Sequence, residues 1–289
     1  MLNDLVTDRD QVMALCDKYR EAFEFYDKPR LAKEVLPSGV KILDCVRYEC
    51  LRPVKEDPGS RDKCFVLIHG GAFVYGYKEL DRCFGMHLAK RTGVSVLNFN
   101  YDLMPGISLT DMITRLMFTI AEAARLFGYN TLYLCGDSAG AYIAYAIALI
   151  SRNPLIATGF NIEDAPGLNI EGAGLICGCY DLPKDRFPGV LFEMESEREL
   201  KSYAYDLKQL ADADKNLKVA IVTGDKDFLR QDNLDLAKAL TKAGCKVRYL
   251  DLSSRGEYEL YHVFPITAPD MPQSQEALDL IAGIPGVTW

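Results

Sequence analysis

Between residues 64 and 281 the sequence alternates short apolar runs with longer segments that place apolar residues at helical spacing. A short apolar run is typical of a strand buried on both faces, and such strands joined by helices form a mostly parallel sheet. The fold class that we expect is therefore α/β, with helices on both faces of the sheet. The expected strands are 64–68, 94–99, 131–135, 173–177, 217–222 and 246–252, and the expected helices are 80–91, 110–127, 139–150, 233–243 and 273–281.

The segments outside this alternation are less regular. Apolar residues at helical spacing from Val12 to Phe23 predict an amphipathic helix that Pro29 should end. Residues 40–50 alternate in the manner of a strand, and residues 55–63 form a polar loop. The charged stretch 193–210 is expected to be helical. A chain of 289 residues is long for one domain, but α/β folds of this length are often one unit, so we expect a single domain over 1–289.

The charge balance limits the classes of partner. The sequence has 33 Lys and Arg against 41 Asp and Glu, which gives a formal net charge of −8 and a pI near 5.1. Nucleic acids and anionic membranes are bound by basic patches, so we expect neither as a partner. Residues 1–5 lack a signal-peptide pattern, and no run approaches the roughly 18 apolar residues of a membrane span. We therefore expect a cytoplasmic protein.

The nine cysteines are scattered and lie mostly within apolar runs. This distribution is typical of reduced, packed thiols rather than of a secreted disulfide framework. Cys177 and Cys179 flank a glycine, but they lack the second cysteine pair or nearby histidine that a zinc site uses. We expect no metal and no organic cofactor.

A serine between two glycines follows the predicted strand 131–135 and precedes the predicted helix 139–150, in the sequence Gly-Asp-Ser-Ala-Gly at 136–140. On such a sharp turn a Cβ at Gly136 or Gly140 would crowd the backbone that projects the serine hydroxyl. Ligands of parallel sheets bind at the carboxyl ends of the strands, so we predict that Ser138 is a nucleophile. The alternative is a structural turn with a serine that takes no part in chemistry.

A glycine-rich loop, His-Gly-Gly-Ala-Phe at 69–73, follows the predicted strand 64–68. The backbone amides of Gly70 and Gly71, together with that of Ala139, are candidate donors to a developing oxyanion. The alternative is a loop without a ligand. A phosphate-binding role is less favoured, because no Gly-x-Gly-x-x-Gly or Gly-Lys-Ser/Thr pattern accompanies the loop.

The chain has only three histidines. His69 belongs to the glycine-rich loop and His87 lies within a predicted helix, whereas His262 follows the last predicted strand and is the candidate general base. A carboxylate must hold the imidazole in the correct tautomer. The loop after strand 217–222 offers Asp225 and Asp227, which spacing alone does not separate.

Taken together, these motifs resemble those of the hormone-sensitive-lipase-like group of esterases, which have the α/β-hydrolase fold. Residues 136–140 are identical to the group's Gly-Asp-Ser-Ala-Gly turn, and residues 69–73 and 262–264 resemble its His-Gly-Gly-Gly-Phe and His-Gly-Phe. Asp-Phe-Leu-Arg at 227–230 resembles its Asp-Pro-Leu-Arg, which favours Asp227 over Asp225. The order nucleophile, acid, histidine is that of an α/β-hydrolase. The resemblance extends from about residue 64 to 264.

The sequence also departs from the group's pattern. Ala72 replaces the third glycine of the loop, and Asp102, in Tyr-Asp-Leu-Met-Pro at 101–105, replaces the arginine of the group's Tyr-Arg-Leu-Ala-Pro. The resemblance further implies a small helical cap over Ser138, formed by about residues 1–40 and 181–214.

By this resemblance we expect a serine esterase that hydrolyses small, short-acyl esters such as acetyl esters through Ser138, His262 and Asp227. The same machinery can cleave a thioester, a lactone or an N-formyl amide, and a non-catalytic receptor for a small ligand is a further alternative. The expected partner is a small-molecule ester, and a homodimer is left open.

Overall fold

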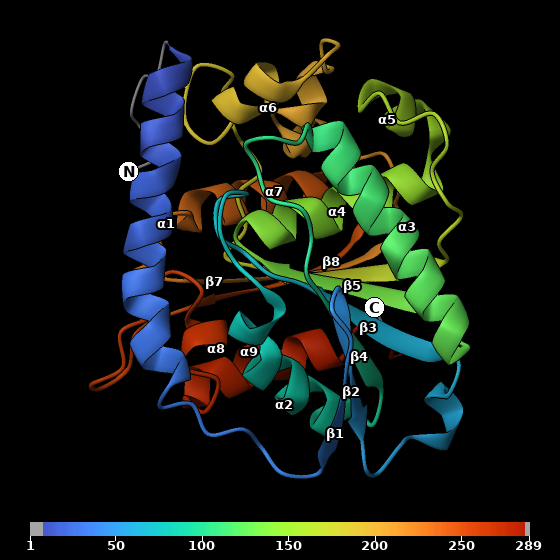
Figure 1. The fold of residues 1–289 in the computed structure, drawn as a ribbon. Helices are drawn as coiled ribbons and strands as arrows, with labels where there is room; N and C mark the ends of the chain where they lie inside the picture. Colours follow the sequence, from blue (N-terminus) through green and yellow to red (C-terminus); the bar gives the residue numbers. More distant parts are fainter. Residues whose placement is uncertain (1–7, 287–289) are drawn as a thin grey trace.

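The computed structural model describes residues 8–286 and is drawn in Figure 1. Its strands are β1 (Val40–Asp44), β2 (Tyr48–Pro53), β3 (Lys63–Ile68), β4 (Ser95–Phe99), β5 (Thr131–Asp137), β6 (Ile170–Ile176), β7 (Lys218–Gly224) and β8 (Lys246–Leu252). Its α-helices are α1 (Arg9–Leu31), α2 (Arg82–Thr92), α3 (Leu109–Phe127), α4 (Ala139–Arg152), α5 (Pro154–Gly159), α6 (Val190–Glu195), α7 (Arg230–Ala243), α8 (Phe264–Thr267) and α9 (Pro272–Ala282). Short 3₁₀ turns are η1 (Pro58–Ser60), η2 (Lys78–Leu80), η3 (Ser202–Ala204) and η4 (Leu207–Leu210).

The strands form one sheet in the order β1-β2-β4-β3-β5-β6-β7-β8. The pairings of β3 with β4 and β5, and those along β5, β6, β7 and β8, are parallel, while β2 is antiparallel to both of its neighbours. The predicted α/β class with a mostly parallel sheet is therefore confirmed. The single strand expected at 40–50 was wrong, because the chain reverses after Asp44 and the amide of Cys45 donates to the carbonyl of Tyr48.

Alternate residues of the central strands point to opposite faces of the sheet, as the two-residue period of a strand requires. Val66 and Ile68 pack into the core beneath α3, α4 and α7, and Phe65 and Leu67 pack into the core beneath α2, α8 and α9. Figure 1 shows these two helical layers above and below the sheet. Because the central strands β3 to β7 are buried on both faces, their continuous apolar runs were recognisable in the sequence.

The first helix, α1, stands to one side of the sheet in Figure 1 and buries Val12, Cys16 and Tyr19. It continues two residues past Pro29, so the predicted helix end was wrong. A proline in the last turn removes one backbone donor but does not prevent the next residues from closing the helix. The amide of Ala32 donates to the carbonyl of Lys28 at 3.1 Å. Residues 1–7 of the predicted cap segment lie outside the described residues.

The segment between β6 and β7 contains only the short helix α6 and the turns η3 and η4, so the helix expected at 193–210 was wrong in most of its length. The backbone of this segment is used in tertiary pairing instead. The amide of Leu182 donates to the carbonyl of Tyr205, and the amide of Leu207 donates to the carbonyl of Tyr180. These bonds use a backbone carbonyl and a backbone amide that a continuous helix would pair within itself. Tertiary contacts therefore override the helix propensity of this segment.

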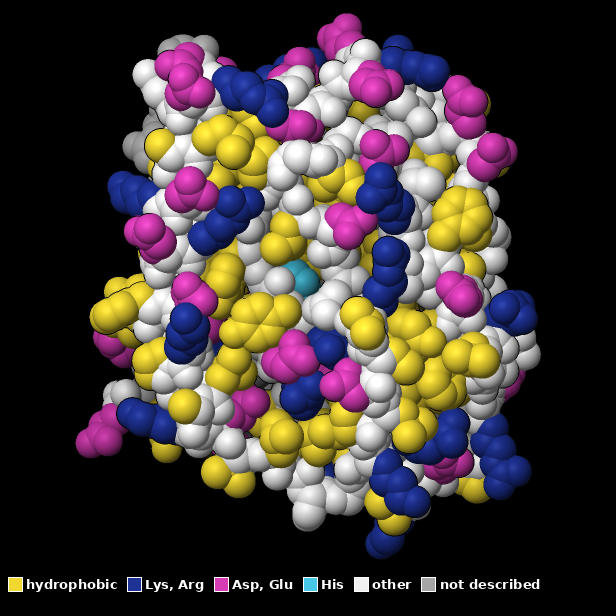
Figure 2. Space-filling model, viewed as in Figure 1, with side chains coloured by type: hydrophobic (Ala, Val, Ile, Leu, Met, Phe, Trp, Pro, Cys, Tyr) yellow, Lys and Arg dark blue, Asp and Glu magenta, His cyan; other side chains and the backbone are white. Residues whose placement is uncertain are grey.

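Within the part of the chain that the structure describes, no helix combines the length and the apolar character that crossing a membrane demands. Figure 2 shows Lys and Arg side chains interspersed with Asp and Glu over the face seen in Figure 1, with a histidine near its middle beside hydrophobic side chains.

Candidate active site

Ser138 lies on the turn between β5, which ends at Asp137, and α4, which begins at Ala139. Its backbone has φ 51° and ψ −118°, a conformation that L-residues rarely adopt. The amide of Ser138 donates to the carbonyl of Ile176 at 2.9 Å, which ties the turn to the neighbouring strand β6. Strained backbone of this kind persists only where its surroundings hold it, and it is often found at functional sites.

The glycines on either side of Ser138 are required by close backbone contacts. A Cβ at Gly136 would lie 2.4 Å from the carbonyl oxygen of Gly140, and a Cβ at Gly140 would lie 2.0 Å from the carbonyl oxygen of Ile68. Both distances are far shorter than any normal contact, so no larger residue fits without movement of the backbone. The steric reason given for the two glycines from the sequence is confirmed.

Ser138, His262 and Asp227 come from three separate loops and meet at the carboxyl ends of β5, β7 and β8. The hydroxyl oxygen of Ser138 lies 2.9 Å from Nε2 of His262, and Nδ1 of His262 lies 2.7 Å from Oδ1 of Asp227. An ionised carboxylate can only accept, so Nδ1 carries the hydrogen and Nε2 is free to accept from the serine hydroxyl. The structure thus brings together the three side chains predicted to act as nucleophile, base and acid.

The environment of Asp227 keeps its carboxylate charged. Burial opposes ionisation, but hydrogen bonds from His262, from the amide of Leu229 at 3.0 Å and from the hydroxyl of Thr223 at 2.8 Å outweigh it, and the pKa of Asp227 is lowered. Asp225, in contrast, is exposed and accepts two hydrogen bonds from Ser254. Thr223 was not singled out from the sequence; it lies near the end of β7, two and four residues before the two aspartates.

The other two histidines lie elsewhere in the site or outside it. His69 is fully buried with Nδ1 2.8 Å from the carbonyl oxygen of Gly70, and burial lowers its pKa to about 4. His87 lies on α2, 3.4 Å from Asp270, where burial lowers its pKa. The structure therefore places His262, and not His69 or His87, within hydrogen-bonding distance of the Ser138 hydroxyl.

The glycine-rich loop after β3 has an unusual backbone at three successive residues. Gly71, Ala72 and Phe73 have φ of 110°, 51° and 66°. A Cβ at Gly71 would lie 2.0 Å from the carbonyl oxygen of Tyr75, so this glycine is sterically required. Ala72 shows that a residue with a Cβ is accommodated at the position where the esterase group has its third glycine.

Tyr101 supports this loop from the segment that follows β4. Its hydroxyl donates to the carbonyl of His69 at 2.9 Å, and its ring stacks on the imidazole of His69 with centroids 4.2 Å apart. The neighbouring Asp102, which replaces an arginine of the group's pattern, pairs with Arg115 at 3.1 Å on the surface. The departure at Asp102 therefore leads to an ion pair with α3.

A pair of buried carboxyl groups, Asp81 and Asp137, lies beneath the glycine-rich loop and was not recognised from the sequence. Burial and the neighbouring Asp137 raise the pKa of Asp81 well above its usual range, so Asp81 keeps its proton and donates to Asp137. Burial raises the pKa of Asp137 to about 6. Asp137 stands within the serine motif, but Asp81 lies on a different segment, and only the tertiary structure brings the two together.

The backbone of Gly70 favours the charged form of Asp137 and partly offsets the effect of burial on its pKa. A Cβ at Gly70 would lie 2.5 Å from Oδ2 of Asp137, so the two groups are in close contact. Gly70, whose amide is one of the three predicted to face an oxyanion, therefore lies directly against Asp137.

The side chains of Ser138 and His262 open into a pocket of about 440 Å³. This volume lies within the range of small-molecule sites. The walls are mostly apolar and come from α1, from the glycine-rich loop and from the loops after β7 and β8; they include Tyr19, Phe23, Tyr26, Asp27, Arg30, Tyr75, Leu80, Pro188, Phe228, Leu229, Val263 and Ile266.

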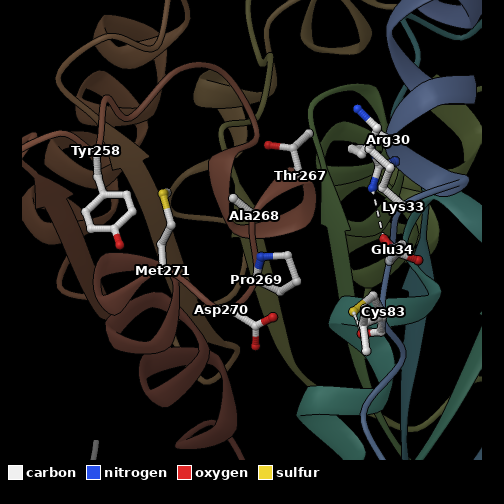
Figure 3. A pocket seen from close by; sticks show the side chains of 11 residues that line it. Arg30, Lys33, Glu34, Cys83, Tyr258, Thr267, Ala268, Pro269, Asp270 and Met271 are labelled. Carbon is white, nitrogen blue, oxygen red and sulfur yellow. Dashed lines mark hydrogen bonds and ion pairs between the residues drawn. The ribbon is translucent and has the colours of Figure 1, made fainter.

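A second cavity of about 500 Å³ adjoins this pocket and shares Arg30 and Thr267 with it. Figure 3 shows Arg30, Lys33 and Glu34 on one side of this cavity and Tyr258 and Met271 on the other. The guanidinium of Arg30 pairs with Glu34 at 3.2 Å and with Asp27 at 3.3 Å. Arg30 thus forms part of the partition between the two cavities, with its charge neutralised from both sides.

Cys177 approaches the triad side chains closely. The ligating atoms of Cys177, Asp227 and His262 lie within 4.8 Å of one another, a spacing that suits a metal ion. However, a metal ion needs the thiolate, and burial raises the pKa of Cys177 well above its usual range. The hydrogen bond between Asp227 and His262 also occupies two of the groups that a metal would need.

A family model described as an alpha/beta hydrolase fold matches residues 65–257, more than half of the chain, and the match includes Ser138 and Asp227. The chain belongs to the α/β-hydrolase family. The family and fold that the motifs predicted are therefore confirmed. His262 lies five residues beyond the end of the matched range.

Solved structures similar to this α/β-hydrolase include esterases. Esterase B from Lactobacillus rhamnosis has a TM-score of 0.80 at 18% identity, covering 94% of this chain and 96% of that one. The thermostable carboxylesterase EstE1, cloned from a metagenomic library, has a TM-score of 0.68 at 18% identity, covering 95% of this chain and 98% of that one. At these identities the likeness concerns the fold alone.

Curated relatives of this α/β-hydrolase include kynurenine formamidase of Danio rerio, 25% identical over 201 residues. The match covers 68% of this chain and 65% of the relative, so the chain spans slightly less than two thirds of that protein's length. Kynurenine formamidase of Salmo salar matches at the same identity over 202 residues, with the same two shares.

Proposed function

We propose that the protein is a serine hydrolase that cleaves short-acyl carboxylic esters by acyl transfer to water. The observation that carries this proposal is the chain of hydrogen bonds from Ser138 through His262 to Asp227. A nucleophile, a base within its reach and a third group that orients the base are the parts that this chemistry requires. The strained backbone at Ser138, which projects the hydroxyl from the sheet edge, supports the same assignment.

In the proposed reaction, the hydroxyl oxygen of Ser138 attacks the ester carbonyl carbon while Nε2 of His262 takes its proton. The negative charge that develops on the carbonyl oxygen is held by backbone amides, for which Gly71 and Ala139 are the donors we favour. The amide of Gly70 is the third donor that we propose, and Gly70 lies against Asp137.

In the second half of the reaction, His262 gives its proton to the departing alcohol oxygen, and the bond between that oxygen and the acyl carbon breaks. His262 then takes a proton from water, whose oxygen attacks the acyl carbon on Ser138. The bond between that carbon and the Ser138 oxygen breaks, His262 returns the proton to Ser138, and the carboxylic acid leaves. Asp227 keeps the imidazole in the tautomer that this sequence needs and stabilises the charged ring.

We also propose that α1 and residues 181–214 act as the cap over this site. Supporting contacts come from both segments, because α1 contributes Tyr19, Phe23 and Tyr26 to the pocket wall and the second segment contributes Pro188. Tyr19 stacks on Phe187 with ring centroids 4.5 Å apart, which joins the two segments directly.

A second candidate function is hydrolysis of an N-formyl amide. The observation that favours it is the similarity to two kynurenine formamidases, each at 25% identity. An amide carbonyl can be attacked by the same serine, with His262 protonating the departing nitrogen instead of an oxygen.

The experiment that tests the proposal compares hydrolysis of p-nitrophenyl acetate, butyrate, octanoate and palmitate by the wild type and by Ser138→Ala. We expect turnover that is fastest for the short chains and is lost in Ser138→Ala. N-formylaniline in the same assay tests the second candidate. Wild-type protein that is no more active than Ser138→Ala on every substrate would refute the serine-hydrolase proposal.

The cytoplasmic location and the possible homodimer remain proposals. Support for a reducing compartment comes from the nine cysteines, all of which are free thiols within the described residues.

A further inference from the structure

One face of α1 presents a row of aromatic rings to the candidate active site. Tyr19, Phe23 and Tyr26 are four and three residues apart, which places them on the same side of a helix, and all three line the pocket above Ser138. The rings of Tyr19 and Phe23 lie 5.7 Å apart, and that of Phe23 lies 5.5 Å from Tyr75 on the neighbouring loop. Tyr19, Phe23, Tyr26 and Tyr75 are called the aromatic wall below.

A further aromatic ring lies beside the imidazole, on the loop after β7. The side chain of Phe228 is 65% exposed, and its ring centroid lies 4.3 Å from that of His262. Exposure of an apolar ring to water is unfavourable in free energy, and exposed apolar surface at the rim of a pocket commonly marks a binding site.

The position of Phe228 indicates which part of a substrate it would meet. In the proposed reaction His262 protonates the departing oxygen, so the leaving group must lie next to the imidazole. Phe228 packs on the imidazole and lines the same pocket. A group attached to the departing oxygen therefore lies within reach of the Phe228 ring, and both Phe228 and the aromatic wall line the cavity that it would fill.

The charges of the pocket disfavour an anionic ligand. Among the described residues that line the pocket, Arg30 is the only Lys or Arg. Its guanidinium is paired with Asp27 and Glu34 and donates to the carbonyl of Leu80. Of the three acidic side chains that line the same pocket, Asp81 keeps its proton and Asp27 is paired with Arg30, while Asp137 directly precedes Ser138. A carboxylate on the leaving group would find no free cation and would be repelled.

We propose that the leaving group of the substrate is an uncharged aromatic ring that packs against Phe228 and the aromatic wall. The substrate class is then a short-acyl ester of an uncharged aromatic alcohol. This inference rests on the proposed serine-hydrolase function and specifies the substrate of the same site. Flat rings suit such walls, because aromatic pairs are stabilised by ring geometry beyond the area that they bury.

The test compares benzyl acetate with cyclohexylmethyl acetate. The two alcohols have similar size and similar leaving ability, so a difference in kcat/KM reports recognition of the aromatic ring. We expect kcat/KM to be about 3- to 10-fold higher for benzyl acetate, the range that an aromatic contact typically supplies. We expect 4-carboxybenzyl acetate to be hydrolysed less efficiently than benzyl acetate, by on the order of tenfold.

Matched variants locate the effect. Tyr26 and Phe25 are both 73% exposed and lie in edge contact, but only Tyr26 lines the pocket. Tyr26→Leu and Phe228→Leu are expected to reduce the ratio of kcat/KM between benzyl and cyclohexylmethyl acetate towards one. Phe25→Leu is the control that leaves the ratio unchanged, and Tyr26→Phe is expected to retain it because the ring remains.

The possible outcomes separate this inference from the function on which it rests. Equal kcat/KM for the two acetates, or a ratio that Phe25→Leu lowers as much as Tyr26→Leu, would overturn the aromatic site while leaving the esterase intact. A preference for 4-carboxybenzyl acetate would overturn the part that concerns charge. Failure to hydrolyse these acetates and every p-nitrophenyl ester would overturn the serine-hydrolase proposal and this inference with it.

Discussion

Oδ1 of Asp227 lies 2.7 Å from Nδ1 of His262, whereas Asp225, two residues earlier on the same loop, is bonded to Ser254. The two aspartates therefore have different partners despite their proximity in the sequence. The side chain of Asp227 is fully buried, and that of Asp225 faces solvent. This difference leads to a direct test of which carboxylate serves the histidine.

Asp227→Asn is expected to reduce kcat on p-nitrophenyl acetate by about 10⁴-fold, because an amide at this position favours the wrong tautomer of His262. Asp225→Asn is the matched control and is expected to change kcat only slightly. Steady-state kinetics of both variants, with circular dichroism to verify folding, make the comparison. Equal losses in the two variants would contradict the assignment of Asp227.

Gly140→Ala is expected to destabilise the protein even though alanine normally favours a helix. The added Cβ would lie 2.0 Å from the carbonyl oxygen of Ile68, and overpacking of this kind typically costs about 1–3 kcal/mol or more. Gly167→Ala is the control, since a Cβ there meets no atom within 4 Å. Thermal unfolding measures the difference, and an unchanged midpoint in Gly140→Ala would show that the turn can widen.

Asp137→Asn is expected to change how stability depends on pH. Burial raises the pKa of Asp137 from 3.8 to about 6 in the folded protein, so its contribution to stability is greatest below the unfolded pKa and is lost as the pH rises through 6. The variant lacks this titration. Its free energy of unfolding should therefore improve relative to wild type between pH 4.5 and 7, by on the order of 2 kcal/mol.

Urea unfolding at several pH values measures this change, with Asp225→Asn as a control of opposite sign. Hydrogen bonds from Ser254 lower the pKa of Asp225, so its contribution is present above the unfolded pKa and is lost in acid. Asp225→Asn should accordingly lose stability relative to wild type as the pH rises. A pH-independent difference between wild type and Asp137→Asn would refute the titration of Asp137.

Reducing agent is expected to leave activity and folding unchanged, because all nine cysteines are free thiols. Seven of them are buried, and burial raises the pKa of Cys16 to about 11 and that of Cys83 to about 12. A thiol reagent should react readily with the exposed Cys45 and with the seven buried thiols only on unfolding. Rapid reaction of most thiols in the native protein would contradict this packing.

Several features of the fold and the site could be predicted because they depend on short stretches of chain. Strands buried on both faces appear as continuous apolar runs, and Gly128 ends α3 with a φ of 78° that favours glycine. The motif around Ser138 could be recognised for the same reason, because Gly136 and Gly140 crowd each other within five residues, whereas the contact of Gly140 with Ile68 on β3 is tertiary. The choice of Asp227 over Asp225 rested on a family resemblance, because spacing alone carries no information about which side chain turns inward.

What the sequence by itself determined is the alternation of strands and helices, the sheet edge at which Ser138 lies and the residue types available there. Tertiary structure alone decided that Asp81 meets Asp137, that the aromatic face of α1 covers the pocket and that 193–210 pairs with the backbone at 180–182 instead of forming one helix. Periodicity reports which face of an element is apolar, because that depends on neighbours a few residues away. It does not report which distant element that face will meet, because that contact is fixed by the packing of the whole chain.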